Sequence, residues 1–375
     1  MESLDDLVKL YFKRCYSYRE ILYTLRHVHN ISTSIRTLHR THRRLNLYRK
    51  GHVSDTKDLI EFVREELNGS GSCVSYRQMH HRCVNNGLRV NRSSVAAAMS
   101  VIDPEGVECR RRKYLRRRMY FSRGPNWVWH IDGYDKLKPY GFSIHSAIDG
   151  FSRKIIWLAI SRSNKEPRFV CSLYLNHVSQ VNRVPRMVVA DLGTQNIYVA
   201  AAQRFLRRKH TDSSSAFNSF KYGKSTSNQR IEALWSHLRR GCTNWWMNYF
   251  KDLIEVEKYN SASPIQRECL FFYDGLNSDL KEFKQSWNGH RSDVLYHTPS
   301  FSDPSIQTYE QNVDYNDLNL LQTTFQYETV TKHICTVEFF ELASILMVEN
   351  SLVPAKNAEE ALCLHETLLR LIDAV

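Results

Sequence analysis

Several features that mark common protein classes are missing from this chain of 375 residues. No run of eighteen apolar residues occurs, which excludes a transmembrane helix. The nine cysteines are odd in number and form no Cys-x-x-Cys pair, so neither a disulfide scaffold nor a zinc finger is indicated. The scattered cysteines favour a reducing interior compartment. Residues 1–6 are acidic and lack the regions of a signal peptide.

The composition, by contrast, indicates a folded protein with a polyanionic partner. Hydrophobic residues make up 42% and charged residues 24%, and the length fits two or three domains. The net charge of +13 divides into +12 over residues 1–120, +10 over 121–295 and −9 over 296–375. A basic body of this size favours nucleic acid as partner, although solubility alone is an alternative. The acidic tail either shields that body or binds another protein.

Residues 1–52 are expected to form a helix-turn-helix unit. Apolar residues recur at helical spacing in three short segments, with a turn at Asn30 and N-caps at Ser17 or Tyr18 and at Ser32 or Ser34. The outer face of the third helix carries the candidate DNA-binding residues Arg36, Arg40, Arg43 and Arg44. Arginine can grip phosphates or the edge of guanine, whereas the alternative is an ordinary solvated helix face.

Residues 53–120 are expected to form a second helical DNA-binding unit and a basic linker. Helices are predicted from Leu59 to Leu67, over about 76–84 and from about Asn91 to Ile102. Seven of the next nine positions are basic: Arg110, Arg111, Arg112, Lys113, Arg116, Arg117 and Arg118. This run is predicted to track a phosphate backbone or to serve as a nuclear import signal, which would place a eukaryotic protein in the nucleus.

Residues 121–295 show the order of a mixed α/β sheet. Strands are predicted at 127–132, 142–149, 154–160 and 187–191, with a helix over about 166–181. In the first strand, Val128, His130 and Asp132 share one face. Residues 208–228 have no periodicity and are predicted to be a mobile loop, and a helix is predicted from Tyr259 to Trp287.

Three acids in this block are candidate metal ligands. Asp132 and Asp191 stand at strand ends, and Glu232 lies beside the buried stripe of a predicted helix. Three converging carboxylates repel one another unless cations separate them, and oxygen-only ligands suit Mg²⁺ or Mn²⁺. Each acid alone has a simpler interpretation as a turn, cap or solvated residue.

Four ordered motifs resemble the integrase core of transposases and retroviral integrases. They are Gly-Pro-Asn-Trp-Val-Trp-His-Ile-Asp-Gly at 124–133, Ala-Ile-Asp-Gly-Phe-Ser-Arg at 147–153, Ala-Asp-Leu-Gly-Thr-Gln-Asn at 190–196 and Asn-Gln-Arg-Ile-Glu-Ala-Leu-Trp at 228–235. The acids are separated by 59 and 41 positions. Residues 192–195 depart from the more Gly-rich or acidic stretch that follows the second acid in related sequences. The zinc-binding His/His and Cys/Cys arrangement of retroviral integrases is not found near this N-terminus.

The resemblance implies a ribonuclease H-like core within a multidomain α plus α/β protein. It implies Asp132, Asp191 and Glu232 as catalytic metal ligands for phosphodiester cleavage and strand transfer during DNA recombination, with element ends and target DNA as partners. Asn196, Arg230 and Lys224 are predicted to hold phosphates, whereas Asp135 and Asp149 are predicted to be non-catalytic. A homo-oligomer is possible, and neither a membrane nor a small-molecule cofactor is expected.

Two other functions remain open from the sequence. One is a host-captured, non-catalytic DNA-binding protein on the same scaffold, and the other is a nuclease acting on RNA–DNA hybrids. Residues 296–375 form an acidic C-terminal region, in which Ala358 to Ile372 has the pattern of an amphipathic helix.

Overall fold

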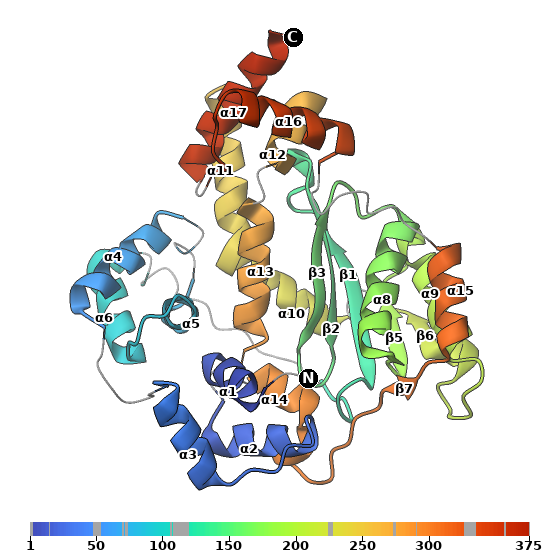
Figure 1. The fold of residues 1–375 in the computed structure, drawn as a ribbon. Coiled ribbons are helices and arrows are strands. Elements are labelled where there is room, and N and C mark those ends of the chain that lie inside the picture. Colours follow the sequence, from blue (N-terminus) through green and yellow to red (C-terminus); the bar gives the residue numbers. More distant parts are fainter. Residues whose placement is uncertain are drawn as a thin grey trace.

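The computed structural model describes residues 3–14, 16–47, 54–69, 71, 74–105, 107, 120–223, 228–272, 275–289, 291–325, 335–355 and 358–374 (Figure 1). The basic run over 110–118 and Lys224 lie outside these residues. Within the described part, no helix is both long and apolar enough to cross a membrane. The expected order is confirmed: helical N-terminal units, a mixed-sheet core and a helical C-terminal region.

The two N-terminal units each contain three helices with their own small cores. The first has α1 (Leu4–Lys13), α2 (Tyr18–His27) and α3 (Ile35–Arg44), and the second has α4 (Thr56–Leu67), α5 (Tyr76–Asn85) and α6 (Arg92–Ile102). Ser17 and Ser75 begin their helices with capping boxes, in which side chain and backbone bond reciprocally. Asn30 adopts a left-handed φ of 56° at the predicted turn, and Ser34 is the N-cap of α3.

The core is a five-stranded mixed sheet in the order β3-β2-β1-β5-β6. Its strands are β1 (Val128–Tyr134), β2 (Ser143–Asp149), β3 (Ile155–Ser161), β5 (Met187–Ala190) and β6 (Phe220–Tyr222). The first three strands are antiparallel neighbours, whereas β5 pairs parallel with β1 and β6 pairs parallel with β5. This arrangement confirms the ribonuclease H-like fold.

Helices cover both faces of the sheet (Figure 1). On one face Trp129 and Ile131 pack in a cluster with α8 (Pro167–Val181) and α9 (Ile197–Leu206). On the other face, the apolar residues of α10 (Gln229–Leu238) pack with Ile144 and Ile148 of β2. The predicted alternation of β1 is therefore confirmed, and it turns His130 and Asp132 toward α10.

Two predictions about the chain around these helices were wrong. Residues 208–228 do not form only a loop, because a short 3-10 helix (Ala216–Ser219) and β6 occupy part of this stretch. The predicted helix over 259–287 is instead two helices, α12 (Pro264–Phe272) and α13 (Gly275–Trp287). Proline at the first position of α12 and glycine at the first position of α13 mark the interruptions.

The polypeptide stays helical from α10 to the end of α11. A five-residue π-helix, η6 (Arg239–Thr243), leads directly into α11 (Asn244–Glu255). The second N-terminal unit contacts this segment, because the buried Arg82 donates a hydrogen bond to the carbonyl oxygen of Gly241 at 3.3 Å. The first unit contacts the core through Arg14, which forms a 2.6 Å ion pair with Asp293 in α14 (Arg291–His297).

The acidic C-terminal region packs on two sides of the core. Its first helix, α15 (Tyr315–Thr324), lies against α8 and α9, and β7 (Gln311–Asn312) pairs with β4 (Arg183–Val184). Its last helices, α16 (Val337–Glu349) and α17 (Ala358–Asp373), lie beside α11 and α12 (Figure 1). The predicted amphipathic helix from Ala358 is confirmed as α17.

Candidate active site

Parallel pairing brings two of the three candidate acids to neighbouring positions. In the register of β1 and β5, His130 is opposite Val189. Asp132 lies two residues beyond His130, and Asp191 lies two residues beyond Val189. Because neighbouring strands are about 4.8 Å apart and side chains alternate between faces, both carboxylates emerge on the same side of the sheet.

Helix α10 brings the third acid to the same place. The indole Nε1 of Trp235 donates a hydrogen bond to Oδ2 of Asp132 at 2.9 Å. Glu232 lies three residues before Trp235 and therefore on the same face of the helix. It also lies in the first turn, where the helix dipole favours a negative charge.

The electrostatic environment of Asp132 reflects this convergence. The pKa of Asp132 is raised to about 7, mainly by burial and also by the negative charges of Asp191 and Glu232, while hydrogen bonds from Trp235 and the Gly133 backbone oppose the shift. Asp191 and Glu232 are thus close enough to raise the pKa of Asp132. The two neighbouring charges disfavour ionisation of Asp132, and a bound cation would relieve that repulsion.

A buried hydrogen-bond chain holds the start of α10 against β1. Asn228, the N-cap of α10, donates through Nδ2 to the carbonyl oxygen of Ile131 at 3.1 Å. Its Oδ1 must therefore accept, and it lies 2.6 Å from Nδ1 of His130. Nε2 of His130 lies 2.7 Å from the hydroxyl of Tyr120, and burial lowers the pKa of His130 to about 4. A neutral His130 then donates from Nδ1 and accepts from Tyr120.

Asp191 is oriented by the turn that follows β5. Asn196 donates from Nδ2 to Oδ1 of Asp191 at 3.2 Å and to its carbonyl oxygen at 3.4 Å. Asn196 is fully buried, and its own Oδ1 has no hydrogen-bond partner among the described residues. The sequence predicted Asn196 as a phosphate contact, and its observed position is that of a support for Asp191.

Two further acids near the sheet have structural roles. Asp149 accepts hydrogen bonds from the backbone of Asn126, Phe151 and Ser152 and from the Ser152 hydroxyl, which organises the turn after β2. Asp135 accepts from Asn164 at 3.0 Å. Both carboxylates serve local structure, as expected.

The donor chemistry of the three acids fits a hard divalent cation, because they offer only carboxylate oxygens. Their side chains do not form a closed ligand set. Across the part of the chain that the structure describes, no group of three or more His, Cys, Asp or Glu could hold a metal ion. Trp235 also binds one oxygen of Asp132. The type of ligand therefore agrees with Mg²⁺ or Mn²⁺. The three carboxylates would have to move closer to one another to bind a shared ion.

The predicted phosphate-binding residues fall into separate groups. Arg36, Arg40, Arg43 and Arg44 are all exposed on α3, and Arg44 pairs with Asp5 at 2.6 Å. Arg230 lies near the candidate acids on α10, but it donates to the carbonyl oxygen of Gly150 at 3.0 Å and lies over the Tyr120 ring. The basic run and Lys224 stay predictions outside the described residues.

Sequence reasoning missed the residues that support the acids. Trp235 was assigned to the buried stripe of its helix, although a buried indole N–H usually finds a partner. His130 shares a predicted strand face with Asp132, which was a usable signal. The role of Asn228 depends on where α10 meets β1, and no local pattern contains that information.

Comparison with known proteins supports this architecture. No curated protein matches the chain. Residues 119–300 match the family model described as integrase core domain, which spans the five-stranded sheet, α10 and all three candidate acids. The region of the chain that contains the sheet and these acids is an integrase core domain of the integrase and transposase type.

Proposed function

We propose that this protein binds DNA and catalyses metal-dependent phosphodiester cleavage and DNA strand transfer. One observation carries the proposal: the pKa of the partly buried Asp132 is raised in part by the charges of two further carboxylates that are distant in sequence. The match to an integrase core supplies the reaction class. In that class, water first cleaves a phosphodiester to release a 3′-hydroxyl, which then attacks a phosphodiester of the target DNA.

Asp132, Asp191 and Glu232 would hold the divalent ions. When bound, Mg²⁺ or Mn²⁺ activates the attacking oxygen and stabilises the leaving oxygen of the phosphodiester. Neighbouring side chains orient two of these acids by hydrogen bonds. Trp235 directs one oxygen of Asp132, and Asn196 directs one oxygen of Asp191.

DNA binding is proposed to use the basic N-terminal units. The four arginines on α3 lie on its exposed face, whereas Leu38, Thr41 and His42 point into the core of the unit. An exposed cationic helix of this kind suits contacts with phosphates or base edges. We also propose that a eukaryotic protein acts in the nucleus, with the basic run as import signal.

The test is a strand-transfer assay on supercoiled DNA with Mg²⁺ or Mn²⁺. Wild type should nick and join DNA, and Asp191→Asn should abolish both reactions. Asp252→Asn is the matched control, because Asp252 is an exposed aspartate on α11. The control should retain activity.

Other outcomes of the same assay would identify the alternatives. If wild type and Asp191→Asn bind DNA equally and neither yields products, the protein is a non-catalytic DNA-binding protein on an integrase scaffold. If an RNA–DNA hybrid is cut while DNA is neither nicked nor joined, the protein is a hybrid nuclease.

A further inference from the structure

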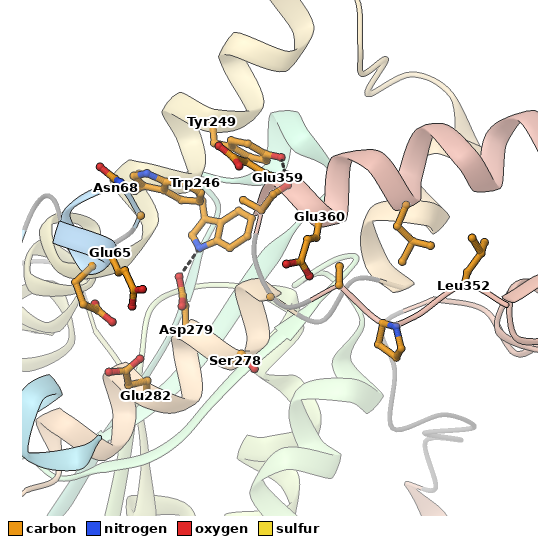
Figure 2. Close-up of a pocket in the computed structure, with 18 of the residues that line it drawn as sticks. Glu65, Asn68, Trp246, Tyr249, Ser278, Asp279, Glu282, Leu352, Glu359 and Glu360 are labelled. Atoms are coloured by element: carbon orange, nitrogen blue, oxygen red, sulfur yellow. Dashed lines mark hydrogen bonds between the residues drawn. The ribbon is translucent and has the colours of Figure 1, made fainter. Parts of the chain in front are cut away.

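A groove of about 1480 Å³ separates the second N-terminal unit from the C-terminal helices (Figure 2). Residues of α4, α5, α11, α13, α16 and α17 line it, and none of the three candidate catalytic acids is among those described in the lining. The groove is therefore distinct from the proposed active site. Its lining comes from parts of the chain that do not contribute to that site, including the acidic C-terminal region.

One wall of the groove is aromatic and preorganised. The rings of Trp245 and Tyr249 stack at 5.1 Å with an interplanar angle of 9°, and Trp246 meets Trp245 edge-on at 4.9 Å. The Tyr249 hydroxyl donates to the carbonyl oxygen of Ala358 at 2.8 Å. Trp246 Nε1 donates to Oδ2 of Asp279 at 2.8 Å, as Figure 2 shows. These bonds set the aromatic surface before any ligand binds.

The charged residues of the lining are mostly acidic, although the chain as a whole is basic. Among the described lining residues, one carries a full positive charge, Arg82, and it is paired with both Glu66 and Glu282. Six carry a carboxylate: Glu65, Glu66, Asp279, Glu282, Glu359 and Glu360. Such a surface repels nucleic acid and attracts a cationic partner.

We propose that this groove binds a partner protein through an arginine-rich segment. A guanidinium group can lie flat on tryptophan or tyrosine while its N–H fork reaches carboxylates, and the groove offers both within one surface. A lysine ammonium lacks the planar fork and is the weaker ligand. The proposal goes beyond DNA cleavage and joining, and it holds whether or not the core is catalytic.

The experiment uses the full chain without DNA and a fluorescein-labelled peptide of alternating arginine and alanine. Fluorescence anisotropy should show saturable binding that weakens with salt, and a lysine–alanine peptide should bind less tightly. Glu65→Gln with Glu359→Gln should weaken binding of the arginine peptide about 5-fold, because each exposed carboxylate contributes modestly. Trp245→Leu should reduce the preference for arginine over lysine.

The matched control is Glu61→Gln with Glu341→Gln. Glu61 and Glu341 are exposed on α4 and α16 and are not among the described lining residues. This control should bind the peptide as wild type does. Equal affinity of the groove variant and the control would overturn the proposal. Self-association of the protein that disappears in the groove variant would also overturn it, because a second copy would then be the occupant.

Discussion

Replacing Asp132 with asparagine is expected to stabilise the metal-free protein at pH 8. Asparagine retains an oxygen that can accept from Trp235 Nε1, but it carries no charge. The pKa of Asp132 is raised from 3.8 to about 7, mainly by burial. The folded state therefore binds a proton more tightly than the unfolded state does. Stability from this group is fully present below pH 3.8 and is lost as the pH rises through about 7.

The size of the effect follows from the shift of about three pKa units. Each unit corresponds to about 1.4 kcal/mol, so the ionised carboxylate destabilises the fold by an amount on the order of 4 kcal/mol. Asp132→Asn should recover much of this at pH 8 and almost nothing near pH 4. Mg²⁺ should stabilise wild type at pH 8, by about 2.7 kcal/mol at a hundred times its Kd, and should not stabilise the variant.

Urea denaturation in EDTA, at several pH values between 4 and 8, measures this difference directly. Asp252→Asn, on the exposed face of α11, provides the control for removal of an aspartate charge. A variant no more stable than wild type at pH 8 would show that Asp132 ionises there without cost. The raised pKa of Asp132, which follows from burial and from the two neighbouring carboxylates, would then be refuted.

Three further predictions concern the supports of the site and the DNA surface. Trp235→Phe removes a bond that lowers the pKa of Asp132, so the midpoint for Mg²⁺ binding by calorimetry should move to higher pH, and an unchanged midpoint would contradict this. Asn228→Ala should lower the free energy of unfolding in urea by about 2 kcal/mol, because buried partners on β1 lose their hydrogen bonds. Arg36→Ala with Arg40→Ala should weaken DNA binding and reduce its log–log salt slope by about two, whereas Lys251→Ala should not.

Most of the core could be predicted because its signals are local. The alternation before Asp132 predicted which side chains of β1 share a face, and the apolar run from Met187 predicted β5. β6 has only three residues, which are too few to show a strand period. It is a strand because it pairs with the edge of β5. The interruptions at Pro264 and Gly275 were visible in the sequence, but the apolar pattern outweighed them.

The acids could be identified by motif, whereas their supports depend on packing. A tryptophan on an apolar stripe is ordinarily a core residue, and the angle between α10 and β1 decides that its N–H meets Asp132. The groove was not predictable at all. It exists because α11, α13, α16 and α17 line it together with α4, and these elements are far apart in the chain.

Asp149 and Asp132, two aspartates of the same sheet, differ in the partners of their carboxylates. Asp149 accepts three backbone N–H bonds and one hydroxyl bond, and these bonds oppose the burial that raises its pKa to about 6. Asp149→Asn should nevertheless destabilise the protein at pH 8 by about 2 kcal/mol, because the amide NH2 that replaces one carboxylate oxygen cannot accept the hydrogen bonds that this oxygen receives. For Asp132, hydrogen bonds from the Trp235 indole and the Gly133 backbone favour the ionised carboxylate, whereas the charges of two neighbouring carboxylates disfavour it. If the two substitutions change the free energy of unfolding in opposite directions in one urea series, Asp149 organises a turn and Asp132 is available to bind a cation. Destabilisation by both would assign Asp132 to structure.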